Sequence, residues 1–386
     1  MNTIAINIRR LEHLLKLYRL SKEDILLQLN RSRKRPLNED DLFKSEIQFS
    51  YLKAIDSVFN KGINYYLDPK IPTESKEESI FFRKDKFNAE LSLGAKQRVT
   101  QFEEEKIALT TLAKLSNLDL GRKLKVYTSN DNPKDAANEL RKTLYPGKKR
   151  GIRDFLKAFI NKLSEQNIVV YEFVDTHNKR EKANINGFFL APNIIVLKRI
   201  QKSLRREVFT LAHELGHYLL NAEEIDEIYE DFNENVPLNK IEKWCNDFAY
   251  YFLAGEHDEL ISSISDVNRQ TDYQDEFITS LTFEIPLSKI AIYTRLVVTK
   301  KIDQHTYDVI RDRIHQAYLE YEEEQQRKKE REKDLGIKQD GRNPVPIISP
   351  LVKRTLQSAF FEGVINEAEF CKRLKINPEK IESYLQ

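Results

Sequence analysis

The sequence predicts an α+β fold that is mostly helical. Over most of the 386 residues, apolar side chains recur with the 3.6-residue period of an amphipathic helix. Three short runs rich in β-branched and aromatic residues indicate strands, at 167–174, 186–190 and 193–197. A strongly helical pattern follows them. We therefore expect one small sheet packed on this helix, with helical regions before and after it in the chain.

Composition excludes several classes of protein. The chain has 63 basic and 61 acidic residues, so it has no overall charge that would attract nucleic acid or a membrane surface. It shows neither a basic N-terminus followed by a long apolar run nor a long uncharged apolar stretch. The two cysteines, Cys245 and Cys371, lie far apart and in no metal-binding spacing. We expect a cytoplasmic protein with reduced thiols, no signal peptide and no membrane span.

Residues 1–75 are predicted to form a helical domain that looks like a degenerate helix-turn-helix. The helical pattern is interrupted at Ser21, which is placed to cap a second helix, with Asp24 three residues later. A recognition helix should follow. Instead, the basic run Arg31–Arg35 leads into a proline and three acidic residues that would repel phosphate. A helical interaction domain with a solvated basic loop is the favoured interpretation, and DNA binding is the alternative.

Helical segments continue to the start of a central domain. One amphipathic helix is predicted over 42–66, with prolines beyond its end. Residues 76–145 are predicted as a helical connector, with a long helix at about 88–117 and a second helix that starts at an Asn-Pro pair. After a Pro-Gly loop, the apolar spacing of 152–166 predicts the first helix of a central domain at 146–300.

The central domain contains an H-E-x-x-H pattern in the segment REVFTLAHELGHYLLN, at His213, Glu214 and His217. Histidines four positions apart lie on one face of a helix, where both imidazoles can reach one tetrahedral metal ion. Glu214 sits about 100° round the helix from His213, where it could accept a proton from a water molecule beside the metal. An apolar stripe on another face would pack under the sheet, formed by Val208, Leu211, Ala212, Leu215 and Leu219.

A catalytic zinc ion needs three protein ligands and one open position. A third histidine six residues after His217 would complete one known set, but residue 223 is a glutamate. The other set takes a carboxylate from a following helix, and in the helical pattern of 241–255 Glu242 could reach the metal. Spacing alone does not single out Glu242, because other carboxylates compete with it: Glu223, Glu224, Asp226, Glu227 and Asp247.

The C-terminal part is predicted to be helical and without catalytic residues. Residues 301–340 contain a charged helix, in which acidic residues precede basic residues by four positions, and a linker. A spacer is favoured over a partner-binding coiled coil, because apolar heptad positions end after Tyr321. Residues 341–386 are predicted as a small module of two or three short helices.

Together these segments resemble the ImmA/IrrE-type metallopeptidases. The family signature is an R-x-x-F-T-x-A-H-E-x-x-H helix followed by a second helix with E-x-x-A-N-x-F-A. This chain has RREVFTLAHELGH and then EKWCNDFA, with Cys245 for the usual alanine. The segments NGFFLAPNIIVL upstream and FITSLTFEIPLSKIAIYTRLVV downstream are also similar to the family. The match covers roughly residues 150–300, and FFRKDKF at 81–87 resembles the longer members with an N-terminal helix-turn-helix.

The resemblance implies a zincin-like peptidase domain, in which a short sheet packs on the motif helix and on a second ligand helix. It implies His213, His217 and Glu242 as the ligands of one Zn²⁺ ion per chain, and Glu214 as the general base. Family members cleave, or are proposed to cleave, DNA-binding repressors in phage, mobile-element and stress responses, and some act in toxin–antitoxin pairs. The chain differs from the family at 253–255, where Leu-Ala-Gly replaces a frequent L-M-P and would alter the cleft wall.

The sequence therefore predicts a zinc metallo-endopeptidase whose partner is a regulatory protein, such as a repressor or a neighbouring gene's product. The rival hypothesis is a non-catalytic, antitoxin-like or transcription-regulating binding protein with a structural or vestigial zinc site. Arg205 and Arg206 are expected to pair with carboxylates or to orient the start of the motif helix. No residue is assigned as oxyanion stabiliser, because spacing selects none of the nearest candidates: Tyr218, Tyr250, Tyr251 and His257.

Overall fold

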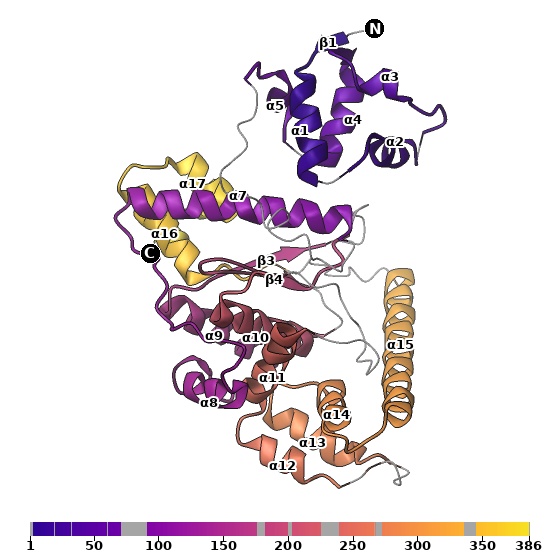
Figure 1. Cartoon of the computed structure of the whole chain (residues 1–386), viewed down its shortest axis with the longest axis vertical. Helices are drawn as coiled ribbons and strands as arrows, with labels where there is room; N and C mark the ends of the chain where they lie inside the picture. The colour runs from indigo at the N-terminus through magenta and orange to yellow at the C-terminus, as the bar shows by residue number, and fades with distance from the viewer. Residues whose placement is uncertain are drawn as a thin grey trace. The chain divides into compact units, whose positions relative to one another are not determined.

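The computed structural model describes most of the chain (Figure 1). It covers residues 3–18, 20–31, 33–59, 61–70, 91–175, 182–199, 203–224, 239–265, 267, 272–335 and 345–385. The FFRKDKF segment lies outside these ranges. The chain forms two compact units, and it passes from one to the other within helix α7 (Leu93–Leu115), at residues 101–102. Among the described helices, none has both the length and the apolar composition that a membrane crossing requires.

The N-terminal unit packs short helices around one apolar core, together with a two-stranded antiparallel sheet. β1 (Thr3–Ala5) pairs with β2 (Glu46–Gln48). The helices are α1 (Ile8–Tyr18), α2 (Lys22–Asn30), α3 (Glu39–Leu42), α4 (Phe49–Phe59) and α5 (Ile63–Leu67). Apolar side chains from α1, α2 and α4 are completely buried in this core, among them Leu11, Leu14, Ile25, Leu52 and Ile55.

The predicted cap of the second helix is confirmed. The Ser21 hydroxyl accepts a hydrogen bond from the N–H of Asp24 at 3.1 Å, and the Asp24 carboxylate accepts one from the N–H of Ser21 at 2.8 Å. Beyond the basic run, Asn38 and Asp41 cap the four-residue helix α3 in the same way. The first turn of α3 is acidic, in the position where a recognition helix would begin. DNA binding by this unit stays a prediction.

The prediction of a single helix over 42–66 is wrong. The segment is interrupted at β2, because Ile47 is completely buried where β2 pairs with β1. It is interrupted again after α4, where the Asp56 carboxylate accepts the N–H groups of Lys61 and Gly62 at 3.0 and 2.9 Å. Gly62 has a φ of 82°, a backbone conformation that glycine adopts at little cost.

The larger unit contains the predicted sheet and most of the helices, so the expected α+β, mostly helical fold is confirmed. Its strands are β3 (Val169–Val174), β4 (Gly187–Leu190) and β5 (Ile194–Arg199). The helices beside them are α8 (Pro133–Leu144), α9 (Ile152–Glu165), α10 (Leu204–Leu220) and α11 (Lys240–Ala254). The later elements are α12 (His257–Ser263), α13 (Asp275–Glu284), α14 (Lys289–Val298), α15 (Gln304–Asp334), α16 (Pro350–Phe361), α17 (Glu367–Leu374), η1 (Pro378–Lys380) and α18 (Glu382–Leu385).

The sheet has the order β3–β5–β4, with β3 parallel and β4 antiparallel to β5. Helices α9 and α10 cover one face of the sheet, and the part of α7 that belongs to this unit, from residue 102 onward, covers the other (Figure 1). On the α7 side, the ring of Phe102 lies 5.5 Å from that of Tyr171 and 6.2 Å from that of Phe188. On the α10 side, the predicted apolar stripe is completely buried. These layers hold α10 firmly against the sheet.

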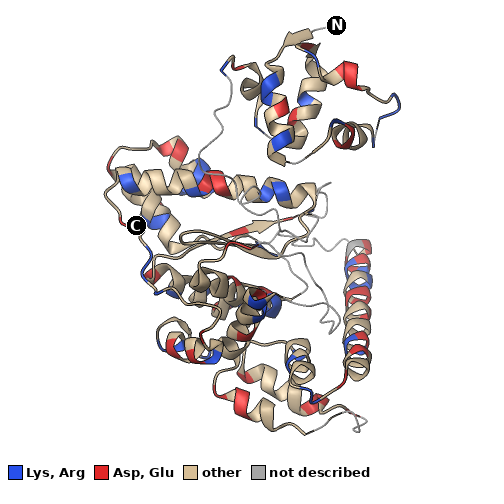
Figure 2. Ribbon diagram, in the orientation of Figure 1, with Lys and Arg blue, Asp and Glu red and all other residues tan. Residues whose placement is uncertain are grey.

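Only the start of α15 is packed against other elements. Tyr307 and Ile310 are buried, but none of the described side chains at 311–335 is. Acidic and basic residues follow one another along this helix (Figure 2). Arg327, for example, lies 3.3 Å from Glu323 one turn before it. Pairs of this kind stabilise an exposed helix from within, as the charge pattern predicted.

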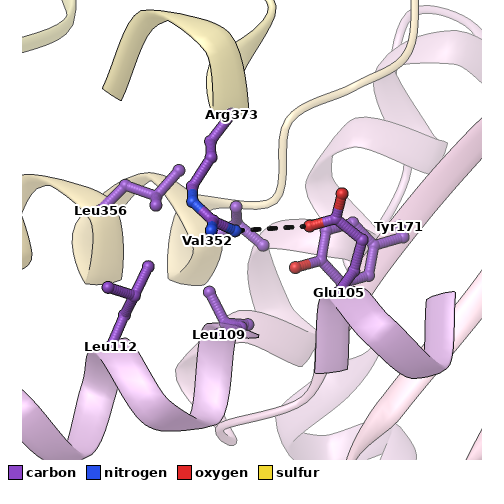
Figure 3. Close-up of a pocket in the computed structure, with 7 residues that line it drawn as sticks. All are labelled: Glu105, Leu109, Leu112, Tyr171, Val352, Leu356 and Arg373. Carbon is purple, nitrogen blue, oxygen red and sulfur yellow. Dashed lines mark ion pairs between the residues drawn. The ribbon is translucent and has the colours of Figure 1, made fainter. Parts of the chain in front are cut away.

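The C-terminal helices pack against α7, α9 and β3. Ser349 is buried at the start of α16, and its hydroxyl lies 3.0 Å from that of Ser164 in α9. Arg373 of α17 pairs with Glu105 of α7 at 3.9 Å. Figure 3 shows a cavity of about 20 Å³ between these elements, which has room for roughly one water molecule. It is lined by Glu105, Leu109, Leu112, Tyr171, Val352, Leu356 and Arg373.

A buried cluster of charges connects the C-terminal segment to the sheet. Arg199 of β5 pairs with Glu207 of α10 and lies 3.6 Å from Glu172 of β3. The Glu172 carboxylate also accepts the N–H of Ile347 at 2.6 Å. Burial raises the pKa of Glu172 to about 7, although the Ile347 hydrogen bond and the charges of Arg199 and Arg153 act against this rise and only Glu207 adds to it.

The raised pKa of Glu172 predicts a pH dependence of stability. Between its ordinary value of 4.5 and about 7, the folded protein keeps a proton that the unfolded chain releases. The folded state is therefore stabilised at low pH and loses this contribution as pH rises through about 7. We expect the free energy of unfolding of the wild type, minus that of Glu172→Gln, to fall by about 1–3 kcal/mol from pH 5 to pH 8 in urea titrations. Parallel pH profiles of the two proteins would contradict this.

Candidate metal centre

Helix α10 carries the H-E-x-x-H motif and is held at both ends. Near its start, the guanidinium of Arg205 donates to the carbonyl oxygens of Ile285 and Leu287 at 2.7 and 3.1 Å. Arg205 therefore orients the start of the helix through backbone carbonyls between α13 and α14. Just beyond its end, the Glu223 carboxylate accepts the N–H of Ala191, in the turn between β4 and β5, at 2.7 Å. The motif helix is thus fixed relative to the sheet.

Helix α11 begins beside the motif and packs along α10. Asn239 caps it by accepting the N–H of Glu242 at 2.8 Å, which fixes Glu242 in the first turn. The two helices approach closely at Gly216, where an added Cβ would lie 3.1 Å from the Cα, Cβ and Sγ atoms of Cys245. Because Cys245 lies one turn after Glu242, this contact sets how near the Glu242 carboxylate comes to α10.

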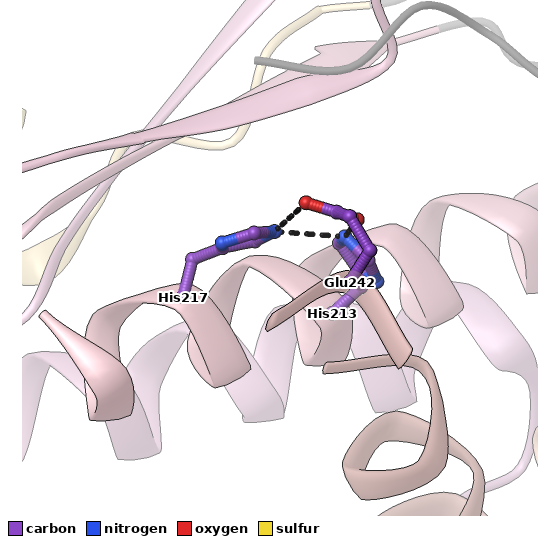
Figure 4. Close-up of side chains that lie close together, drawn as sticks. All are labelled: His213, His217 and Glu242. Atoms are coloured by element: carbon purple, nitrogen blue, oxygen red, sulfur yellow. Dashed lines mark hydrogen bonds and ion pairs between the residues drawn. The ribbon is translucent and has the colours of Figure 1, made fainter. Parts of the chain in front are cut away.

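Three of the predicted site residues meet at this helix pair, as Figure 4 shows. The Nε2 atoms of His213 and His217 are 3.0 Å apart. The Glu242 carboxylate lies 3.2 Å from Nε2 of His213 and 3.1 Å from Nε2 of His217. Ligands on a tetrahedral zinc ion, with bonds of about 2.0–2.1 Å, are about 3.3 Å from one another. The three donor groups therefore have nearly the spacing that such an ion requires.

The chemistry of the donor set also fits a metal ion. Two imidazole nitrogens face each other at 3.0 Å, and one of them must present a lone pair to the other unless a cation lies between them. His217 and Glu242 are only 2% and 4% exposed, so bulk water does not solvate these groups. A bound cation would satisfy both nitrogens and the carboxylate at once. Among the described residues, no second group of three potential ligands converges in this way.

The carboxylates that compete with Glu242 in the sequence have other partners. Glu223 binds the β4–β5 turn, and Glu224 accepts a hydrogen bond from the Asn239 side chain at 3.0 Å. Asp247 accepts one from Arg295 at 2.8 Å. Two further candidates lie outside the described residues: Asp226 and Glu227. Of the described candidates, the structure brings only Glu242 to the two histidines, and its role as a ligand stays a prediction.

The fourth predicted residue, Glu214, is buried beside the triad. Its Oε2 atom has no hydrogen-bond partner among the described residues. Burial raises the pKa of Glu214 to about 7, against the opposing effect of His217 and His213. Burial would also raise the pKa of Glu242, but hydrogen bonds to the two histidines and their charges hold it below its ordinary value. The site thus pairs a strongly acidic carboxyl group with one that binds a proton more readily.

Strand β4 passes directly over the motif helix. A Cβ on Gly187 would lie 2.9 Å from Cγ2 of Thr210 and 3.1 Å from Cγ of Glu214. Gly187 is the first residue of β4, within the strand predicted at 186–190. Glycine is needed here because the strand approaches the helix too closely for a side chain. Spacing along the chain could not reveal this contact.

The tyrosines among the candidates for oxyanion stabilisation have structural roles. The hydroxyls of Tyr250 and Tyr251 bond to side chains of α12 and α14. Tyr218 is completely buried in the core, and His257 is the first residue of α12. The three tyrosines are therefore held by hydrogen bonds or by packing in the core, and no residue is assigned as the oxyanion stabiliser.

The family difference at 253–255 lies at the far end of α11. Gly255 ends the helix with a φ of 55° and packs against the guanidinium of Arg141. It follows Glu242 by thirteen residues, roughly 20 Å along the helix axis. The glycine therefore serves the end of the helix and does not touch the triad.

Residues 163–262 match the Peptidase M78 family, whose domain is described as IrrE N-terminal-like. The matched range runs from the end of α9 through the sheet, α10 and α11 into α12, and it contains all four predicted site residues. The comparisons with curated proteins and with solved structures gave no match. Residues 163–262 thus form a domain that matches a metallopeptidase family, as the motifs of the sequence indicated.

The contact between Gly216 and Cys245 gives a testable prediction. Gly216→Val adds three carbon atoms where even a Cβ would be tightly packed, so we expect overpacking to lower the free energy of unfolding by about 1–3 kcal/mol. The same change should weaken metal binding, because it pushes Glu242 away from the histidines. Cys245→Ala is the matched control, since it removes only the sulfur. Urea unfolding and competition with a chelator measure the two effects. If Gly216→Val had the unfolding free energy and metal affinity of the wild type, the contact would not determine the position of Glu242.

Proposed function

We propose that this chain is a zinc-dependent endopeptidase that cleaves a regulatory protein. The observation that carries this proposal is the meeting of His213, His217 and Glu242 beside the buried carboxylate of Glu214. The match of residues 163–262 to a metallopeptidase family supports peptide-bond hydrolysis as the reaction. Zinc is favoured among divalent ions because two imidazole nitrogens and one carboxylate, at tetrahedral spacing, form a donor set that it prefers.

The proposed chemistry divides between the ion and Glu214. His213, His217 and Glu242 would hold the ion, which when bound polarises the scissile carbonyl and lowers the pKa of a water molecule to about 7. Glu214 accepts a proton from the attacking water and passes it to the nitrogen of the leaving amine. Because Glu214 is buried, its carboxylate exchanges this proton with the reacting groups rather than with bulk solvent.

The sheet offers a place for an extended polypeptide. β4 is an edge strand, and among the described residues it pairs with β5 alone. Gly187 brings this strand against Glu214. A substrate segment that paired with the free edge of β4 would lie beside the general base, held by main-chain hydrogen bonds. This arrangement favours a protein substrate over a small molecule.

The regulatory role rests on the resemblance to the ImmA/IrrE group. Its members act, or are proposed to act, on DNA-binding repressors in phage, mobile-element and stress responses or within toxin–antitoxin pairs. We therefore take a cytoplasmic repressor, or the product of a neighbouring gene, as the substrate. The N-terminal helical unit would recognise this partner, and contact with DNA through Arg31–Arg35 is the alternative.

Glu214→Gln separates metal binding from catalysis. The amide keeps the shape of the side chain but does not accept the proton, so we expect Glu214→Gln to bind about one zinc ion per chain, as the wild type does. His213→Ala should bind little. On co-expression with the neighbouring gene's product, cleavage by the wild type should be seen by mass spectrometry, and both variants should reduce it by about 10²-fold or more. Elemental analysis of the purified proteins gives the zinc content.

Either of two results would overturn this proposal. One is a wild-type protein that neither contains zinc nor binds added zinc. The other is wild-type cleavage by Glu214→Gln. If Glu214→Gln and His213→Ala both preserve the biological effect, the rival function replaces the proposed one: a non-catalytic, antitoxin-like or transcription-regulating binding protein.

A further inference from the structure

A second polar residue of α11 contacts His213, on the side of its ring that faces away from His217 and Glu242. Asn246 follows Glu242 by four residues, so the two side chains lie on one face of the helix. The Oδ1 atom of Asn246 lies 2.9 Å from Nδ1 of His213. The other ring nitrogen, Nε2, faces Glu242 and His217. The same helix face thus contacts both edges of the His213 ring.

We propose that Asn246 is a positioning residue for His213, an inference that rests on the metal centre of the proposed function. An amide oxygen only accepts hydrogen bonds, so this contact requires a proton on Nδ1 of His213. With the proton held there, the lone pair of Nε2 is available to a metal ion. The hydrogen bond also fixes the rotation of the ring, which aims that lone pair at the point between the three ligands.

The two histidines differ in how their rings are held. The side chain of His217 is only 2% exposed, and its Nδ1 has no hydrogen-bond partner among the described residues. Its ring is therefore oriented by packing. The side chain of His213 is 15% exposed, so it lies on the more open side of the cluster. His213 is consequently the ligand whose orientation depends on a hydrogen bond.

The backbone at Asn246 is held in place by contacts of the residues on either side. The residue before it, Cys245, packs against Gly216 of α10. The residue after it, Asp247, accepts a hydrogen bond from Arg295 of α14 at 2.8 Å. Because α11 is held on both sides of Asn246, the amide oxygen is presented to His213 by a fixed backbone. This is the arrangement that pre-orients a metal ligand before the ion arrives.

The test compares the zinc affinities of three variants of the full chain. Asn246→Leu removes the acceptor at similar size, whereas Asn246→Asp keeps an acceptor oxygen. Lys243→Ala, at an exposed position of the same helix, is the control. Competition between each protein and a chromophoric chelator for Zn²⁺ gives the dissociation constants. The thermal unfolding midpoints of the zinc-free proteins, measured in parallel, report any purely structural effect.

We expect Asn246→Leu to bind zinc about 10–100-fold more weakly than Lys243→Ala, with a similar midpoint for the zinc-free proteins. Asn246→Asp should restore binding to within a few-fold of the wild type. Equal affinities for Asn246→Leu and Lys243→Ala would overturn the positioning role alone. A lowered midpoint without rescue by Asp would also overturn it, because Asn246 would then be structural. A wild-type protein that binds no zinc would overturn the proposed function together with this inference.

Discussion

The contact between α10 and α11 is the constraint on which the metal centre depends. The H-E-x-x-H motif brings two candidate ligands together by its own helical spacing, but the third candidate lies on another helix, which must be held at the correct distance. Gly216 permits that distance, because a Cβ there would lie only 3.1 Å from Cys245, closer than such atoms normally pack. Glu242 and Asn246 lie on the same helix, so one packing contact sets both the carboxylate and the hydrogen bond to His213.

The sheet and the flanking helices serve this helix pair. α10 is buried against β4 and β5, Arg205 holds its start, and Glu223 joins the chain just beyond its end to the β4–β5 turn. A second glycine, Gly187, lets β4 pass over Glu214, so this edge strand lies beside the residue that we propose as the general base. On the opposite face of the sheet, Phe102 of α7 packs against Tyr171 of β3. The C-terminal segment is joined to β3 by the hydrogen bond from Ile347 to Glu172. Two close approaches of the backbone, at Gly216 and Gly187, thus position the candidate site.

Local rules in the sequence predicted the elements better than the contacts between them. Periodicity and capping placed α9, α10 and α11, and the motif named two of the residues that meet. Spacing could not choose Glu242 over Asp247, because that choice depends on Asp247 being bound to Arg295 from a helix distant in the chain. Nor could spacing show why residue 187 is a glycine, since the reason is a tertiary contact with α10. The prediction of one helix over 42–66 was wrong for the same reason, because Ile47 pairs with Ile4 of β1, which lies more than forty residues earlier in the chain.

The most direct measurement is X-ray diffraction from crystals of the zinc-loaded protein, collected on both sides of the zinc absorption edge. The account predicts one anomalous peak per chain, bonded at about 2.0–2.2 Å to Nε2 of His213, Nε2 of His217 and the carboxylate of Glu242. A chain without a peak at this position, or with zinc held by a different set of ligands, would contradict it.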